Sequence, residues 1–206
     1  MKTKKPMVKE TVGALYYAFN TPNEKGEFDV TTYEETNKSE VVKNIGTTEN
    51  SESTVVRASG GDYVTASQTA SVEQAVEVVA FDPEDVAKMR GDNIGKYLVK
   101  SGKPSQRPYF AFGKVVKKLG GAVEYVWYPK CQLVENTDDI STSEDTYSEQ
   151  NDTLTIRALA FDEEGNKSVR VNSEMSNFPD GLTEEKFFTK PLTKDEEIET
   201  LITPGT

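Results

Sequence analysis

The 206-residue sequence contains no histidine and a single cysteine. Histidine is the commonest general base and the commonest protein metal ligand, so its absence argues against an enzyme or a metalloprotein. Cys131 cannot form an intrachain disulfide, and its place inside a predicted strand indicates a small core residue in a chain that matures in a reducing cytosol. No apolar run approaches the length of a membrane-spanning helix. We therefore predict no catalytic residue, no metal, no cofactor and no membrane segment.

Basic residues are also scarce, with 24 Lys and Arg against 35 Asp and Glu, which gives a net charge of −11. A nucleic-acid ligand held by phosphate neutralisation needs clustered Lys and Arg, so this balance argues against one. The basic start of the chain lacks the apolar segment that export requires, because Lys9 and Glu10 interrupt it. Residues 1–10 are predicted to form a flexible arm.

What the sequence does contain is a series of strand patterns, and the richest of them covers residues 108–135. Aromatic and β-branched residues fill both of its flanks, and Gly120 and Gly121 between them predict a hairpin with a tight two-residue turn. Tyr125 and Trp127 lie on one face of the second strand, but its other face is not polar either. Such a strand is expected between a core and a second layer or a neighbouring subunit.

The rest of the chain is also mainly β in pattern. A helix of about residues 82–90 is predicted because Asp82 suits the N-cap, Pro83 the first helical position and Gly91 the C-terminal end. Capping-box spacing at Thr193–Glu196 predicts a second short helix near the C-terminus. Further strands are predicted at residues 12–19, 28–33, 40–45, 72–81, 97–99, 153–161 and 169–171.

Residues 46–71 form a long segment rich in Ser, Thr, Gly and Asn. The pair Gly60-Gly61 predicts a small hairpin that projects from the body, and a segment of this length is typical of a functional loop. The alternative is a disordered surface loop. On the strand that follows, Glu73 and Glu77 share one face, where acidic residues are usually just solvated.

Neither a calcium site nor a hydrolase site can be assembled from the acidic residues. Asp138, Asp139, Glu144 and Asp145 lack the central glycine and the closing glutamate of an EF-hand loop. Two carboxylates flanking a cleft would suffice for a glycosidase, but the sequence offers no way to choose them.

A family resemblance extends this reading. From Ala14 to about Asn166 the chain resembles the major tail proteins of long-tailed bacteriophages, especially those of phages with Gram-positive hosts. The resemblance rests on the order of LYYA at residues 15–18, the helix closed by Met89-Arg90-Gly91, RPYFAFG with VEYVWYPKCQL in the central hairpin, and NDTLTIRALA at residues 151–160.

The resemblance implies one tail tube domain spanning residues 1–206, built as a β-sandwich or partial barrel with one flanking helix, a long projecting loop and terminal arms. Residues 46–71 would be a stacking loop, residues 1–10 an N-terminal arm and residues 178–206 a C-terminal arm. Hexameric rings would stack into the tail tube of the virion, assembled in the host cytoplasm. The partners of the tail tube would be the tape measure, tail terminator and distal tail proteins. During ejection, DNA would pass through the lumen of the tube without specific binding.

The resemblance also implies roles for individual residues. Glu73 and Glu77 become candidates for the lumen wall, where acids would prevent adhesion of DNA. Arg57, Asp62 and Tyr63 become candidates for contacts between rings.

Two other function classes stay open at the sequence level. One is a non-enzymatic β-sandwich that binds a receptor or a carbohydrate at a tail tip or cell surface through exposed aromatics such as Tyr63, Tyr97 and Trp127. The other is the hydrolase with two carboxylates.

Overall fold

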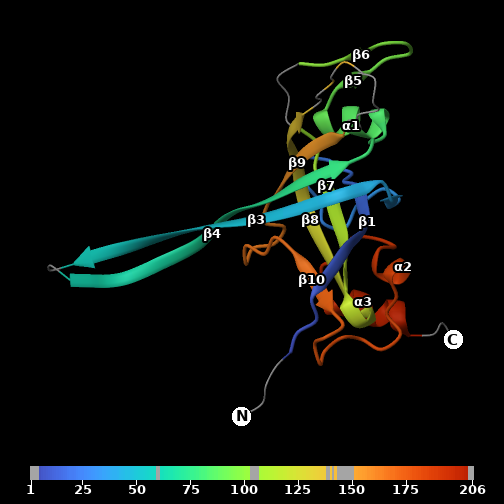
Figure 1. The fold of residues 1–206 in the computed structure, drawn as a ribbon. Coiled ribbons are helices and arrows are strands. Elements are labelled where there is room, and N and C mark those ends of the chain that lie inside the picture. Colours follow the sequence, from blue (N-terminus) through green and yellow to red (C-terminus); the bar gives the residue numbers. More distant parts are fainter. Residues whose placement is uncertain are drawn as a thin grey trace.

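The computed structural model describes residues 5–58, 61–102, 107–137, 140, 142 and 151–203, and at residues 51–58 and 62–70 it describes the backbone alone. Figure 1 shows a body of crossing strands from which one long hairpin projects. The strands are β1 (Lys9–Phe19), β2 (Asn37–Ser39), β3 (Val42–Ala58), β4 (Gly61–Val78), β5 (Asn93–Ile94), β6 (Val99–Lys100), β7 (Phe110–Lys118), β8 (Val123–Thr137), β9 (Asp152–Ala158) and β10 (Val169–Asn172). The helices are α1 (Pro83–Arg90), α2 (Glu184–Phe187) and α3 (Asp195–Ile202), and a 3₁₀ turn, η1 (Leu119–Gly121), joins β7 to β8.

One antiparallel sheet of eight strands dominates the fold, in the order β2-β1-β7-β8-β9-β4-β3 with β10 also paired to β8. The first half of β8 lies between β7 and β10, and its second half pairs with β9. Side chains from β1, β7 and β8 share a core with side chains from β4 and β9, so the sheet curls over on itself. This curl gives the mainly β sandwich or partial barrel that the sequence predicts.

The first core lies inside the curled sheet. It is formed by buried apolar residues of five strands and by Met89 of α1. Cys131 is fully buried in it, as predicted. The largest members are Leu15, Tyr17, Phe19, Phe110, Phe112, Tyr128, Leu133, Leu154 and Ile156.

A second core explains why the central hairpin is apolar on both faces. Its outer face carries Tyr125 and Trp127, and residues 178–202 of the same chain cover it. The Trp127 indole N–H donates to the Phe187 carbonyl oxygen at 3.1 Å, and the Phe188 ring stacks on Tyr16 with centroids 4.0 Å apart. The covering layer therefore comes from this chain, so this face has the second layer and not the neighbouring subunit that was the other expectation.

Gly113 of β7 allows this close packing. A Cβ atom at Gly113 would lie 2.7 Å from the Phe188 ring and 3.0 Å from the Trp127 ring. Only a residue without a side chain fits beneath these two rings. This packing explains why the RPYFAFG segment ends in glycine.

Both the predicted hairpin and the predicted helix are present. Gly120 and Gly121 have φ values of 77° and 81°, although the turn has three residues, Leu119–Gly121, and not the expected two. In α1, the Asp82 carboxylate accepts from the N–H groups of Glu84 and Asp85, and Gly91 ends the helix in the left-handed conformation.

Three local predictions differ from the structure. Residues 28–33 form a turn, because Asn20 donates to the carbonyl oxygens of Asp29 and Thr32 at 2.6 and 2.8 Å. At α3, Glu197 rather than Glu196 caps the helix start, accepting from the Lys194 N–H at 3.1 Å.

The third difference concerns the segments expected to be terminal arms. Residues 178–202 are docked on the sheet, as described above, instead of extending from the body. Near the N-terminus, the Met7 N–H donates to Glu174 at 2.6 Å and the Val8 carbonyl accepts from the Leu119 N–H. Both contacts tie the start of β1 to the body.

Candidate functional site

The projecting hairpin of β3 and β4 is the most distinctive feature of the surface (Figure 1). The two strands pair from Val42↔Val78 out to Ala58↔Gly61, but β9 pairs only with Val72–Val78 of β4. Beyond Val72 the two strands therefore pair only with each other. We call this outer part, residues 50–58 and 61–71, the ribbon. At about 3.3 Å per residue it extends roughly 35 Å from the body.

The ribbon replaces the loop that was predicted for residues 46–71. A small hairpin around Gly60 and Gly61 was expected, whereas β3 and β4 continue as paired strands through nearly the whole segment. Serine and threonine dominate the sequence here, and this composition hides the strand signal because the ribbon has no apolar face to alternate with a polar one.

Of the residues proposed to contact the next ring, two are cross-strand partners near the ribbon end. Arg57 lies opposite Asp62 in the register, and Tyr63 falls at a register shift between Val56 and Arg57. These residues are distant along the strands from Glu73 and Glu77, so the two sets of candidates form separate sites.

Glu73 and Glu77 both lie on the outer face of the sheet at the base of the ribbon. Their neighbours Val72, Val76 and Val78 are buried, so the strand alternates as predicted. This outer face carries charged residues and otherwise mainly small side chains. Its members on β3, β4 and β9 include Thr48, Glu73, Ala75, Glu77, Thr153 and Thr155.

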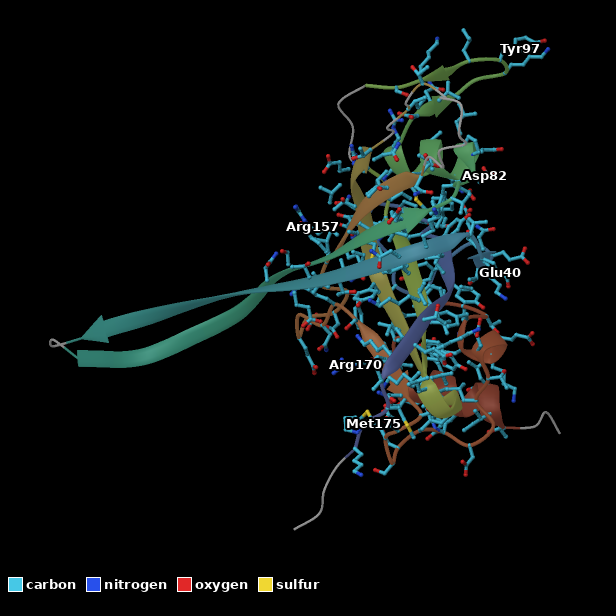
Figure 2. The ribbon with its side chains drawn as sticks, viewed as in Figure 1. Glu40, Asp82, Tyr97, Arg157, Arg170 and Met175 are labelled. Atoms are coloured by element: carbon cyan, nitrogen blue, oxygen red, sulfur yellow. The ribbon has the colours of Figure 1, made fainter. Side chains whose placement is uncertain are left out.

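Glu73 has a partner that sequence reasoning missed. Arg157 of β9 lies directly opposite it, and one Glu73 carboxylate oxygen accepts from the Arg157 Nε and Nη2 groups at 3.0 and 2.8 Å. Figure 2 shows Arg157 beside β4 at the point where the ribbon leaves the body. Alternation along β9 would have put Arg157 on the outer face, but only the register brings it to Glu73. Glu77 in turn accepts from the Asn151 amide at 2.8 Å.

Several strands of the body are bonded on one side only among the residues that the structure describes; β2 and β10, for example, pair only with β1 and β8. β3 ends the sheet and pairs only with β4. On the other side, β2 pairs with β1 only at Leu15–Tyr17, so the earlier part of β1 is bonded on one side, to β7. Exposed edges present unpaired N–H and C=O groups to any further strand.

The aromatic residues considered for ligand binding have different environments. Trp127 is fully buried and cannot contact a ligand, which corrects that part of the binding-module hypothesis. Tyr97, between β5 and β6, is 84% exposed and lies at one end of the molecule (Figure 2). The side chain of Tyr63 and the acidic residues tested for calcium, Asp138, Asp139, Glu144 and Asp145, lie outside the described residues.

Chemistry-bearing clusters are not found in the described part of the chain. Within it, no group of three or more His, Cys, Asp or Glu side chains is arranged to hold a metal ion. Burial raises the pKa of the Cys131 thiol far above its usual range, so the reactive thiolate is disfavoured. None of the described helices is both long enough and apolar enough to cross a bilayer.

Comparisons with models of protein families and with curated protein sequences each found no match. Among solved structures, the chain is similar to a chain in the cryo-EM structure of the anti-feeding prophage baseplate, sixfold symmetrised. The alignment covers 82% of this chain and 97% of that chain, with 11% identity and a TM-score of 0.46. At this TM-score the similarity carries no inference about function.

Proposed function

We propose that this chain is a structural subunit of a phage-type tail, which forms hexameric rings that stack into a tail tube. The observation that carries the proposal is the ribbon, a two-stranded extension that leaves a well-packed β body. The order of motifs that resembles major tail proteins supports the same function, as does the mainly β fold with its helix at residues 83–90.

The ribbon is expected to be stabilised by contact with another protein subunit. A hairpin of two strands alone is marginally stable in water, because it buries little apolar surface. Stacked rings would supply the missing contact, with the ribbon of one subunit laid against the ring above or below. Arg57, Asp62 and Tyr63 near its end are the proposed contacts.

Open strand edges also support ring formation, because neighbouring subunits could pair with them. An exposed strand edge is an aggregation hazard, and closed symmetry removes it by pairing every edge with a neighbour. The outer edge of β3 is one edge available for this, whereas the early part of β1 lies close to β3 of the same chain.

The outer face around Glu73 and Glu77 is the proposed lumen wall. DNA must slide along such a wall, and a face of small polar side chains offers few places for adhesion. Because Arg157 compensates Glu73, repulsion of phosphates in this proposal comes mainly from Glu77 and from the net charge of −11. The tape measure, tail terminator and distal tail proteins remain the proposed partners.

A ribbon deletion tests this function. Asn50 and Ser71 are cross-strand partners, so residues 51–70 can be replaced by an Asn-Gly turn that closes the hairpin at its base. Electron microscopy of the concentrated protein is expected to show stacked rings or tubes for the wild type and unstacked species for the deletion. A wild type that stays monomeric at every concentration, even with tail proteins present, would contradict the proposal.

A second candidate is a receptor- or carbohydrate-binding module. One observation favours it, the exposed hairpin of β5 and β6 with Tyr97 and Leu98 at 84% and 67% exposure. Glycan binding by a stable monomer that is lost in Tyr97→Ala would select this candidate over the tail tube.

A further inference from the structure

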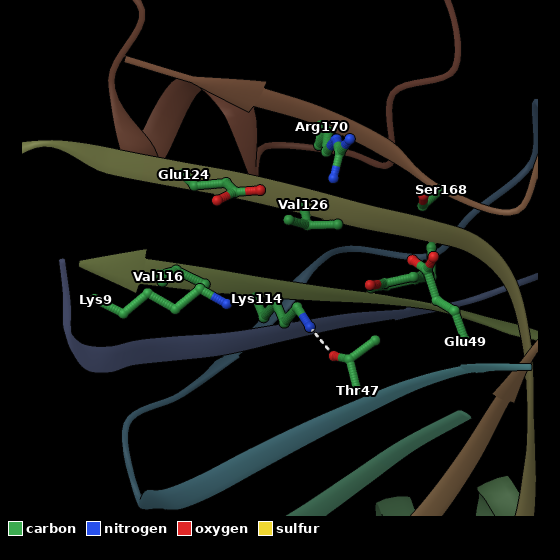
Figure 3. A pocket seen from close by; sticks show the side chains of 10 residues that line it. Lys9, Thr47, Glu49, Lys114, Val116, Glu124, Val126, Ser168 and Arg170 are labelled. Atoms are coloured by element: carbon green, nitrogen blue, oxygen red, sulfur yellow. Dashed lines mark hydrogen bonds between the residues drawn. The ribbon is translucent and has the colours of Figure 1, made fainter. Parts of the chain in front are cut away.

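A pocket of about 330 Å³ opens beside the base of the ribbon (Figure 3). Five strands (β1, β3, β7, β8 and β10) and the loop before β10 contribute to its walls. The residues that line it are Lys9, Thr47, Glu49, Lys114, Val116, Glu124, Val126, Tyr128, Ser168 and Arg170. The proposed lumen wall and the proposed contacts between stacked rings include none of them, although Thr47 and Glu49 belong to β3, whose edge is proposed for ring formation.

Lys114 is the most unusual of these residues, because it is a lysine with only 8% exposure. Its ammonium donates to the Thr47 hydroxyl and, at 3.1 Å, to the Gln74 side-chain oxygen. Both are neutral acceptors, and among the described residues no carboxylate lies within ion-pair distance of Lys114. Buried charges are costly unless they are paired, and Glu49 and Glu124 act on Lys114 only from beyond ion-pair distance.

Two further features show that the site is electrostatically incomplete. Burial and, next, the repulsion of Lys9 lower the pKa of Lys114 to about 8. Behind it, fully buried Gln74 has an amide nitrogen without a hydrogen-bond partner. A buried polar group in this condition is uncommon and indicates a missing partner.

The charges around the pocket set the kind of ligand that would complete it. Three cationic side chains and two carboxylates line the pocket, so one positive charge is in excess. Glu124 is further compensated by Lys118 at 3.6 Å. The excess stands out in a chain with a net charge of −11.

We propose that this pocket binds a carboxylate group. A single negative charge balances the excess, whereas a doubly charged phosphate would meet repulsion from Glu49 and Glu124. Lys114 and Arg170 supply charged donors, and charge-assisted hydrogen bonds of this kind are the strong ones. The hydroxyls of Ser168 and Tyr128 provide further donors on the pocket walls.

The carboxylate can come from two sources. One is a free small molecule, and the other is an Asp or Glu side chain of a second copy of this chain, which carries 35 acidic residues. The second source rests on the proposed assembly, but the first does not.

Titration of the isotopically labelled full chain with sodium acetate tests the pocket itself. At neutral pH, with sodium chloride at equal ionic strength as the control, we expect saturable shifts of the backbone amide resonances of Thr47, Lys114 and Arg170. Lys114→Met and Arg170→Gln should each weaken acetate binding at least tenfold. Arg170 is exposed, so Arg170→Gln is expected to fold. It therefore still tests the pocket if substitution of the buried Lys114 unfolds the protein.

Lys117→Met is the matched control, because Lys117 is an exposed lysine on the same strand. It should bind acetate like the wild type. Saturable binding of phosphate in preference to acetate would overturn the choice of a carboxylate.

Assembly of the same variants separates the two sources. If the wild type binds acetate and both Lys114→Met and Arg170→Gln still form rings, the result supports a free carboxylate as the ligand. Ring formation lost in both variants but kept in Lys117→Met supports a side chain of a second copy. Non-saturable acetate shifts together with normal assembly of all three variants would overturn the proposal. If even the wild type forms no rings, the proposed function fails, and the acetate titration alone decides about the pocket.

Discussion

In both halves of the β3–β4 hairpin the two strands pair with each other, but the halves differ in the strands that lie beside them. In the inner half, Val72–Val78 of β4 lies between β3 and β9, and Val72, Val76 and Val78 are buried. In the outer half, the ribbon, each strand pairs only with the other. Backbone pairing between the two strands is therefore common to both halves, whereas pairing with β9 and packing on the first core are described for the inner half.

The difference separates two contributions to the stability of the hairpin, backbone hydrogen bonds and burial of apolar side chains. A backbone hydrogen bond contributes about 1 kcal/mol net, because water competes for the same groups. Each buried CH₂ contributes about 0.8 kcal/mol. The inner half should consequently respond to mutation through the unfolding free energy, and the ribbon through assembly.

The largest effect is expected for Val76→Asp in the inner half. Val76 is 1% exposed in the first core, and a carboxylate there would be desolvated without a partner. The unfolding free energy should fall by about 4 kcal/mol or more in chemical denaturation. Val79→Asp is the control, because Val79 is 45% exposed just beyond the strand. A loss below about 1 kcal/mol for Val76→Asp would break the comparison.

The next effect concerns Lys114, which lies against the inner half through Thr47 and Gln74. Its pKa is lowered to about 8, so between pH 8 and 10.5 the unfolded chain binds more protons than the folded chain, and stability rises with pH. We expect a gain of roughly 2 kcal/mol from pH 7 to 10 in carboxylate-free buffer. Lys114→Met should remove the gain, and Lys117→Met should retain it.

Above about pH 10, buried tyrosines act in the opposite direction. Burial, followed by hydrogen bonds to Glu184 and Asp85, raises the pKa values of Tyr16 and Tyr17. Stability then falls as tyrosines of the unfolded chain ionise, so the Lys114 measurement is confined to the lower window. Parallel pH curves for the wild type and Lys114→Met would contradict the prediction.

A smaller effect is expected for the ion pair at the border between the two halves. Glu73 and Arg157 are 31% and 46% exposed, and pairs of this kind contribute about 0.2–1 kcal/mol. A double-mutant cycle of Glu73→Gln and Arg157→Gln should give a coupling energy in that range that shrinks at high salt. A coupling of 2 kcal/mol or more would show that the border behaves like the core.

The smallest change in stability is expected for the ribbon deletion used to test assembly. Removing residues 51–70 takes away paired backbone and leaves in place every core residue that the structure describes. The thermal midpoint of the isolated chain should stay within a few degrees of the wild type, which corresponds to less than about 1 kcal/mol. A large drop would mean that the ribbon stabilises the body and would remove the distinction between the halves.

Much of the body was predictable because its signals are local. Asp82, Pro83 and Gly91 define α1 through capping and backbone geometry, and the structure confirms each of them. Gly120 and Gly121 mark the turn of the central hairpin through their positive φ values. Burial of Cys131 follows from its place in an apolar strand.

The features that were missed depend on residues far apart in the chain. Residues 28–33 alternate like a strand, but bonds from Asn20 hold them in a turn. Arg157 meets Glu73 only through the register of β9 with β4. The buried environment of Lys114 arises where β3, β4, β7 and β8 meet, and no stretch of sequence contains that set.

The sequence by itself determined that this protein is mainly β, acidic and built around a hairpin with two apolar faces, since residue type and alternation decide which surfaces must leave water. Tertiary structure alone decided what covers those faces. The inner face closes on β4 and β9, and the outer face closes on residues 178–202. Among the described residues, the ribbon strands pair only with each other and β3 pairs only with β4. Pairing and register join distant segments, and local pattern does not encode them.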